Sequence, residues 1–213
     1  MFADSLGAEV KEFFLPRDFG NDCVGCNRCL LTSEEACPHR ERILPIIKAM
    51  DEADVIVLAS PVYVYHVTGA MKSFLDHLAY RWMLHRPNPD MFFKIGVCIS
   101  TAAGGGTKSA NKDMSDSMLF WGVGKIYGYG ALVRAVSWNK VGEDRKARIK
   151  KEIERLAKKA KRKVGKVRPS LKTKMYFNVM RLLQNKIATP ADEEHWNKYG
   201  WRGKNRPWKR GGK

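Results

Sequence analysis

The sequence predicts an α/β fold with a mostly parallel sheet, on the basis of three observations. Two short apolar runs, Val55–Ala59 and Phe92–Ser100, have the length and composition of strands that are buried on both faces. Each run is followed by a loop and then by a segment with apolar residues at three- and four-residue steps, which is typical of a helix. Strands that alternate with helices along a chain form parallel sheets covered by helices.

The other elements are predicted from the period of their apolar residues. The chain begins with what resembles the last turn of a helix at 2–6, followed by a short strand at Ala8–Leu15 that Pro16 ends. The remaining elements are a helix at 41–51, the strand at 55–59, a helix from 68 that stops before 86–89, the strand at 92–100, a helix at 111–121, a strand at 125–138, a charged helix at 144–164 and an amphipathic helix at 171–184. No run of eighteen apolar residues and no secretory-signal pattern occurs, so we expect a cytoplasmic protein without a membrane span.

The charge is distributed unevenly along the chain. Up to Asn139 there are 14 basic and 15 acidic residues, whereas from Lys140 onward there are 25 basic and 7 acidic residues. This predicts a domain at 1–142, with a cysteine-rich loop at 17–40, and a basic helical extension at 143–213. Such an excess usually forms a solvated face; attraction to nucleic acid, an anionic lipid or an acidic redox partner is the alternative.

Two loops at the ends of predicted strands are the candidate ligand site. Open α/β sheets bind ligands beyond the carboxyl ends of their strands, which meet at one edge of the sheet. The first loop is aromatic and is stiffened by its proline; it contains Ser60, Pro61, Val62, Tyr63, Val64 and Tyr65. The second loop is rich in glycine and contains Thr101, Ala102, Gly104, Gly105 and Gly106. We therefore expect the first loop to form the wall of a site for a planar ligand, with the second loop at the same edge of the sheet.

Four of the five cysteines lie close together, as Cys-x2-Cys-x2-Cys-x7-Cys followed by proline; they are Cys23, Cys26, Cys29 and Cys37. In a cytoplasmic chain such clustering indicates metal or redox chemistry rather than disulfides. Four thiolates could ligate a [4Fe–4S] cluster, and they would also satisfy a tetrahedral zinc site. A loop of partly buried thiols without metal is the third possibility. Cys98 lies within a predicted strand and is expected in the core.

The segment SPVYVYHVTGAMKSFLDH, residues 60–77, resembles the signature of the flavodoxin-like NAD(P)H-dependent FMN reductases. The cysteine spacing is similar to that of their iron–sulfur flavoprotein branch, and the tail at 192–208 is similar to an ending found in some of these oxidoreductases. The resemblance covers most of 8–138. It implies a flavodoxin-like three-layer sandwich and an FMN-dependent NAD(P)H oxidoreductase or electron-transfer flavoprotein.

The resemblance also implies roles for the two loops and the cysteines. The loop at 60–65 would pack against the flavin ring, the loop at 101–106 would approach its other side, and a [4Fe–4S] cluster would take single electrons from it. No side chain is expected to be a catalytic acid or base, and His66 is interpreted as a polar lining group. Exposed aromatic residues on the loops favour a homodimer.

One part of the family pattern is not found. Members of the family begin with a strand and a Ser/Thr-rich turn that binds the FMN phosphate at a helix N-terminus. This sequence starts near the end of that helix, so about 25–30 residues of the pattern are not present. We therefore expect weakened flavin binding, and either a gap in the sheet or direct pairing of the Ala8 and Val55 strands. The alternative function is a non-catalytic binding protein whose basic, aromatic tail contacts nucleic acid or an acidic redox partner.

Overall fold

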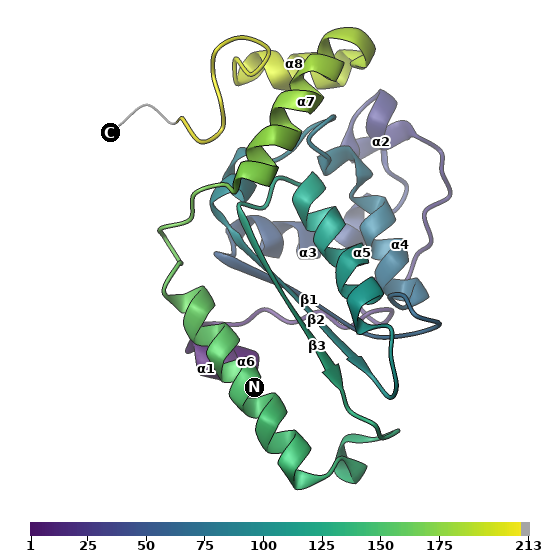
Figure 1. The fold of residues 1–213 in the computed structure, drawn as a ribbon. Helices are drawn as coiled ribbons and strands as arrows, with labels where there is room; N and C mark the ends of the chain where they lie inside the picture. The colour runs from purple at the N-terminus through teal and green to yellow at the C-terminus, as the bar shows by residue number, and fades with distance from the viewer. Residues whose placement is uncertain (210–213) are drawn as a thin grey trace.

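The sheet at the centre of the molecule has three parallel strands (Figure 1). The computed structural model describes residues 1–209, and within them the strands β1 (Val55–Pro61), β2 (Ile95–Ala102) and β3 (Lys125–Leu132) lie in the order β1-β2-β3. Each strand is followed by a crossover to the next, as parallel pairing requires. The predicted α/β class and the parallel sheet are confirmed.

Helices cover both faces of the sheet and make a three-layer sandwich (Figure 1). One face packs on three helices through Ile56, Leu58 and Cys98, and the other packs on two helices through Val97 and Tyr127. The helices are α1 (Phe2–Leu6), α2 (Arg28–Leu31), α3 (Arg40–Glu52), α4 (Gly69–His77), α5 (Thr107–Phe120), α6 (Glu143–Lys161), α7 (Leu171–Ile187) and α8 (Pro190–Lys198), with 3₁₀ turns at Glu34–Ala36, Ala79–Arg81, Pro89–Phe93 and Trp138–Lys140. The helices α3, α4 and α5 form the first layer, and α1 and α6 form the second.

The strand β1 lies at an edge of the sheet, and this corrects the prediction that it is buried on both faces. Ile56 and Leu58 are buried under the first helix layer, but Val57 is 42% exposed on the opposite face. On that side the helices α1 and α6 cover β2 and β3, and of β1 they contact Val55 at its start. An apolar run has the same composition in an edge strand and in a central strand, so its pattern does not report which neighbours are present.

The segment Ala8–Leu15 does not form the predicted strand. Its residues run without regular structure along the surface, where Val10 and Phe14 remain about half exposed and Lys11 pairs with Glu52 at 2.5 Å. A strand exists only where a neighbour accepts its hydrogen bonds, and β1 pairs with β2 alone in the described part of the chain. Direct pairing of the Ala8 and Val55 strands is therefore wrong.

Several helices and strands begin or end at residues other than those predicted, for local reasons. The helix α5 begins at Thr107, four residues earlier than expected, because Gly106 adopts a φ of 88° and starts it. The strand β3 stops at Leu132, opposite the last residue of β2, and does not extend to 138. The helix expected to reach Trp82 ends at His77 and continues as a 3₁₀ turn.

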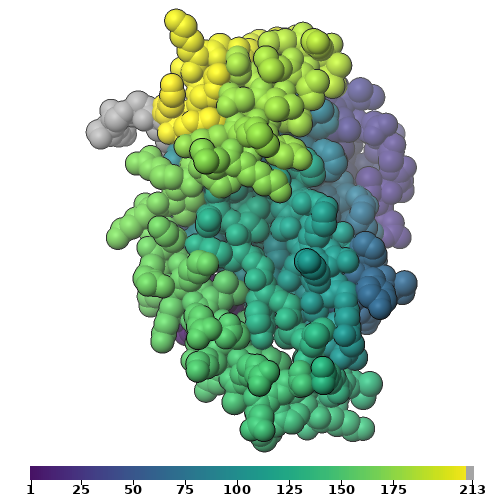
Figure 2. Space-filling model, in the orientation of Figure 1, coloured from purple at the N-terminus to yellow at the C-terminus, as the bar shows by residue number. Residues whose placement is uncertain are grey.

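The C-terminal extension packs onto the sheet region. Trp196 and Trp201 are almost fully buried against Phe92 and Phe177, in a cluster that joins α7 and α8 to the segment before β2. The space-filling view shows the green and yellow residues of the extension lying directly against the teal residues of the sheet region (Figure 2). Within residues 1–209, no helix has the length and apolar character that crossing a membrane requires.

Candidate functional site

The carboxyl ends of β1 and β2 bring the two predicted ligand loops together. Pro61 is in register with Thr101, and the Val62 backbone N–H donates to the Thr101 carbonyl oxygen at 2.8 Å. The loop at 61–66, called the aromatic loop below, and the glycine loop at 103–106 therefore leave the sheet side by side. The expectation that both loops lie at one edge of the sheet is confirmed.

The aromatic loop is a tight turn that holds its side chains out of the protein. The backbones of Tyr63 and His66 exchange two hydrogen bonds of 3.0 Å, and Val64 and Tyr65 between them have φ values of 47° and 67°. Positive φ at both central positions matches a type I′ turn, which is unfavourable for such residues and often occurs at functional sites. Tyr63, Val64 and Tyr65 are 62%, 93% and 68% exposed. They offer a flat apolar surface to a ligand.

The glycine loop contacts the aromatic loop at a position that tolerates no side chain. A Cβ at Gly106 would lie 2.6 Å from Val62 Cγ1 and 2.9 Å from Tyr65 Cα. Gly106 also has a φ of 88°, which a side chain would strain. Gly104 has open space around it. The two loops therefore depend on Gly106 for their contact, while the tip of the glycine loop stays accessible.

Buried hydrogen bonds support the base of the aromatic loop. The Ser60 hydroxyl accepts the Thr68 N–H at 3.1 Å, and the Thr68 side chain in turn caps α4 by accepting the Met71 N–H at 3.2 Å. On the other side, His66 Nδ1 lies 3.0 Å from Asp113 Oδ2 of α5. His66 is thus held at the loop surface, in agreement with its interpretation as a polar lining group.

A cavity of about 680 Å³ lies along the outer side of β3, away from the two loops. It follows the free edge of β3 and is bordered by α5 and by the first turn of α7, with lining residues that include Lys108, Asn111, Lys125, Gly128 and Thr173. None of the predicted loop residues lines it. The space exists because, among residues 1–209, no strand pairs with β3 on this side.

These loops have the character of a site for a planar ring. The exposed aromatic surface and the accessible glycines suit a planar ring, since backbone N–H groups can approach ring oxygens and nitrogens there. The phosphate-binding turn of the family pattern would follow a strand beside β1. In the described residues β1 has no neighbour on that side. The chain therefore shows the elements suited to the ring, and residues 1–209 do not include that turn.

The other three clustered cysteines lie near Cys29, although the four thiols do not form one closed metal-binding group. Cys23 and Cys26 are exposed, and Cys29 and Cys37 are half-buried. Burial raises the pKa of the Cys29 thiol, and the charges of the other three thiols add to this, whereas Arg86 acts in the opposite direction. Across residues 1–209, no three of these four thiols form a group that is close enough to hold one metal ion.

This arrangement bears on which metal the thiols would suit. Four thiolates around one zinc ion lie about 3.8 Å apart, because each bond is about 2.3 Å long and the angles are tetrahedral. A cubane spreads its ligands more widely, since each of its four irons takes one thiolate. The four thiols are therefore not arranged as a closed zinc site in this structure. Cys98 is fully buried in β2, as predicted.

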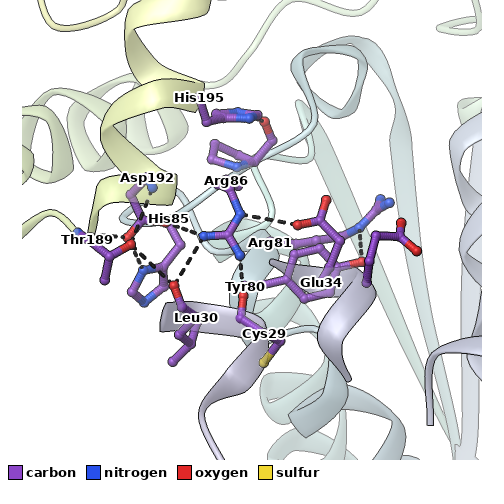
Figure 3. A network of polar contacts seen from close by, with 12 residues as sticks. Cys29, Leu30, Glu34, Tyr80, Arg81, His85, Arg86, Thr189, Asp192 and His195 are labelled. Carbon is purple, nitrogen blue, oxygen red and sulfur yellow. Dashed lines mark hydrogen bonds and ion pairs between the residues drawn. The ribbon is translucent and has the colours of Figure 1, made fainter. Parts of the chain in front are cut away.

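Arg86 clamps the cysteine loop to the rest of the molecule (Figure 3). Its guanidinium group is 7% exposed and donates to Asp192 Oδ1 at 2.6 Å, to Glu34 Oε2 at 3.3 Å and to the carbonyl oxygens of Cys29 and Leu30. One buried cation thus holds two backbone carbonyl groups of α2. Leaving either carbonyl unpaired would cost free energy, so the loop is tied to this cation.

Residues at the start of α8 complete the clamp on the cysteine loop. Thr189 and Asp192 form a capping box there, and the Thr189 hydroxyl also donates to the Leu30 carbonyl oxygen at 3.2 Å. Asp192 is 1% exposed and faces Arg86 and His85 Nδ1, the latter at 2.9 Å. Burial alone would raise the pKa of Asp192, but the hydrogen bond from His85 and the charges of His85 and Arg86 hold it below its usual value.

The sequence did not indicate these clamp residues. Arg86 and Asp192 are 106 positions apart, and Arg86 lies in an Arg-Pro-Asn-Pro segment that predicts only the end of a helix. The one available signal was the resemblance of the tail at 192–208 to a family ending.

The comparison with known proteins identifies relatives of this chain. A family profile described as "NADPH-dependent FMN reductase" matches residues 1–133. An iron-sulfur flavoprotein of Archaeoglobus fulgidus is 31% identical over 133 residues, which cover 61% of this chain and 58% of the relative. An iron-sulfur flavoprotein of Methanocaldococcus jannaschii is 27% identical over 138 residues, which cover 63% of this chain and 68% of the relative. The chain thus spans less than two thirds of the first of these relatives.

A solved structure shares the fold. A flavone reductase superposes with a TM-score of 0.55 at 17% sequence identity, covering 79% of this chain and 58% of that protein. At this identity the similarity concerns the fold alone. The three-layer sandwich with its parallel sheet is therefore flavodoxin-like, as the sequence predicted.

Proposed function

Because the chain belongs to the NADPH-dependent FMN reductase family over residues 1–133, we propose that it is an FMN-dependent oxidoreductase that takes electrons from NAD(P)H. The observation that carries this proposal is the contact of two loops at the carboxyl ends of β1 and β2. There the exposed side chains of the aromatic loop lie beside accessible glycines. This is the edge at which open α/β sheets bind nucleotide cofactors.

When bound, FMN supplies the redox chemistry, since it accepts a hydride and releases electrons singly or in pairs. The task of the protein is to bind the ring and to exclude water from one side of it. We assign ring binding to Ser60, Pro61, Val62, Tyr63, Val64, Tyr65, Thr101, Ala102, Gly104, Gly105 and Gly106. We assign no described side chain at these loops as an acid or base.

We also propose that Cys23, Cys26, Cys29 and Cys37 hold a [4Fe–4S] cluster that accepts single electrons. Two relatives are named iron-sulfur flavoproteins, and four cysteines on one loop can supply the four thiolates that a cubane needs. Arg86 would bind close to the negative charge of the thiolates, through its hydrogen bond to the Cys29 carbonyl oxygen. Reducing conditions that keep these thiols free favour a cytoplasmic location.

The remaining proposals concern partners. The exposed apolar tip of the aromatic loop favours a homodimer, because such a surface is costly to leave in water. The basic extension at 143–213 carries exposed cations on the outer face of α6 that suit an acidic redox partner, among them Arg148, Lys151, Arg155 and Lys158. Nucleic-acid binding by base stacking is less well supported, because Trp196 and Trp201 are buried in the core.

The test is an anaerobic titration of the full-length protein with FMN, followed by separate additions of NADH and NADPH. We expect saturable binding and bleaching of the flavin absorbance by at least one nucleotide. Tyr65→Ala should weaken FMN binding about tenfold, since one aromatic contact contributes about 1.4 kcal/mol. The matched control is Tyr176→Ala on α7, which removes a ring that packs on Phe120 and leaves the loops intact.

Two outcomes would contradict the proposal. An absence of saturable FMN binding would exclude a flavoprotein. Binding without reduction by either nucleotide would leave a flavin-binding protein that is not an NAD(P)H oxidoreductase.

A further inference from the structure

Cys37 has a second set of partners besides the other thiols. Its sulfur and the ring nitrogens of His39 and His77 all lie within 4.8 Å of one another. Cys37 and His39 belong to the turn that leads into α3, and His77 is the last residue of α4. Residues 38 positions apart are therefore brought together by the packing of α3 and α4 on the sheet.

His77 is held in an orientation suited to metal binding. Its Nδ1 lies 2.7 Å from the Ser73 carbonyl oxygen, which can only accept, so Nδ1 carries the proton and Nε2 is left with its lone pair. Histidines that bind metals usually have their other ring nitrogen fixed by such a partner. The ring is 5% exposed, and Phe19 packs edge-on against it with centroids 4.8 Å apart. In this tautomer Nε2 accepts a hydrogen bond from His39 Nδ1 at 2.9 Å, and an ion bound between the two rings would replace the proton of that bond.

We infer that Cys37, His39 and His77 form a binding site for a single Zn²⁺ or a similar divalent ion, with the fourth position left to water. One thiolate and two imidazoles are a ligand set that zinc prefers. Bonds of about 2.0–2.3 Å place the ligands of a tetrahedral ion about 3.3–3.6 Å apart, so small side-chain rotations are sufficient. The site would be distinct from a four-thiolate site, because it needs no atom of Cys23 or Cys26.

The shared cysteine has a consequence for the proposed cluster. Cys37 has one sulfur and cannot complete a cubane while it binds a single divalent ion at the histidine pair. Binding of Zn²⁺ and assembly of a [4Fe–4S] cluster therefore exclude each other. This chain would respond to the supply of the two metals through one residue, in a way that the cysteine spacing alone does not predict.

The test is a titration of the metal-free, full-length protein with Co²⁺, used as a coloured substitute for Zn²⁺, under anaerobic and reducing conditions. We expect a thiolate-to-metal absorption band and displacement of Co²⁺ by Zn²⁺. His77→Asn and Cys37→Ser should weaken binding at least about 100-fold, because removing even an outer partner of a ligand costs 10- to 100-fold. Cys23→Ser and His66→Asn should leave the affinity unchanged.

Two results would overturn the inference. One is a wild-type protein without the thiolate-to-metal band. The other is an equal loss of Co²⁺ affinity in Cys23→Ser and His77→Asn, which would assign the ion to the four thiols. Either result leaves the proposed FMN activity untouched, since the titration uses neither flavin nor nucleotide.

His77 is buried, so its replacement can abolish metal binding by unfolding the protein. A second measurement therefore uses a different variant. His39 is only half-buried and is replaced by asparagine instead. Preloading wild-type protein with Zn²⁺ should reduce the iron and sulfide taken up during reconstitution, whereas His39→Asn should take up the same amount with or without Zn²⁺. A His39→Asn protein that Zn²⁺ still blocks would contradict the site.

Discussion

The aromatic loop and the cysteine loop are both short surface loops, but different parts of the chain hold them in place. The aromatic loop is shaped mainly by residues near it in sequence, through the hydrogen bonds between Tyr63 and His66 and between Ser60 and Thr68. The cysteine loop at 17–40 is held by distant residues, since Arg86 and Thr189 bond its carbonyl oxygens from 57 and 159 positions away. One loop is a local structure and the other depends on the assembled fold.

Because of this difference, we expect the two proposed cofactor sites to respond to different substitutions. Changes in the C-terminal extension should disturb the cysteine loop while the aromatic loop keeps its shape. Changes at the ends of β1 and β2 should have the opposite effect. Four substitutions test this separation.

The largest effect is expected for Arg86→Met. It leaves the buried Asp192 without its arginine partner and removes the Arg86 donor from the Cys29 and Leu30 carbonyl oxygens, of which Leu30 keeps the Thr189 hydroxyl. The free energy of unfolding should therefore fall by about 3–5 kcal/mol. Urea unfolding gives the stability, and alkylation followed by mass spectrometry shows whether Cys29 becomes as reactive as the exposed Cys23. Arg81→Met is the control, since its partner Asp51 is 31% exposed and neither residue touches the cysteine loop. Equal exposure of Cys29 in both variants would contradict the clamp.

A second large effect is expected for Gly106→Ala. Its Cβ would overlap Val62 and the Tyr65 backbone at a positive φ, at a cost of about 1–3 kcal/mol. If the aromatic loop moves to relieve this strain, FMN binding should weaken about 10- to 100-fold. Gly104→Ala meets no atom within 4 Å and should bind FMN as the native protein does. Equal affinities for the two variants would show that the loop contact is not part of the site.

The clamp should also make the protein sensitive to acid. The pKa of Asp192 is held below its usual value of 3.8 in the folded state. Its contribution to stability is therefore complete above the unfolded pKa and is lost as the pH falls from about 5 downward, by up to about 1.4 kcal/mol for each unit of the shift. Unfolding by urea at a series of pH values should show a smaller acid dependence for Asp192→Asn. Parallel curves for the two proteins would assign the acid loss to other carboxylates.

The smallest effect is expected for Ser60→Ala. The change removes the buried hydroxyl that accepts the Thr68 N–H, so unfolding should become easier by about 1 kcal/mol. Because the loss lies at the base of the aromatic loop, the alkylation rate of Cys29 should not change. Ser115→Ala on the outer side of α5 is the control and should stay within about 0.5 kcal/mol of the native stability. A faster reaction of Cys29 in Ser60→Ala would show that the two loops are coupled.

The parts of the fold that depend on local pattern could be predicted from the sequence. The apolar run at Val55–Ala59 forms most of β1, and the periodic segment at 41–51 forms α3. Of the predicted strand at 92–100, residues 95–100 form most of β2, whereas Phe92 and Phe93 belong to a 3₁₀ turn. The segment Ala8–Leu15 has an equally good strand pattern and forms no strand. A helix satisfies its own hydrogen bonds, whereas a strand needs a neighbour that the pattern does not reveal.

The candidate site likewise has a part that could be predicted from the sequence and a part that could not. The meeting of the two loops at one sheet edge follows from the rule that parallel strands end together, so residues 60–65 and 101–106 could be placed from the sequence. The Arg86–Asp192 pair and the grouping of Cys37 with His39 and His77 could not. Each joins residues from elements whose packing has no local signal.

The sequence by itself determined the α/β class, the strands β1, β2 and β3 with the helices that connect them, and the residue types present in the two loops and the cysteine cluster, because these follow from periodicity, turn chemistry and cysteine spacing. Only the tertiary structure decided that β1 is an edge strand, that α8 clamps the cysteine loop, and that Cys37 has two histidines as well as another cysteine near it. These features depend on which surfaces meet when the chain packs. Contacts of that kind join residues tens of positions apart, beyond the reach of any local pattern.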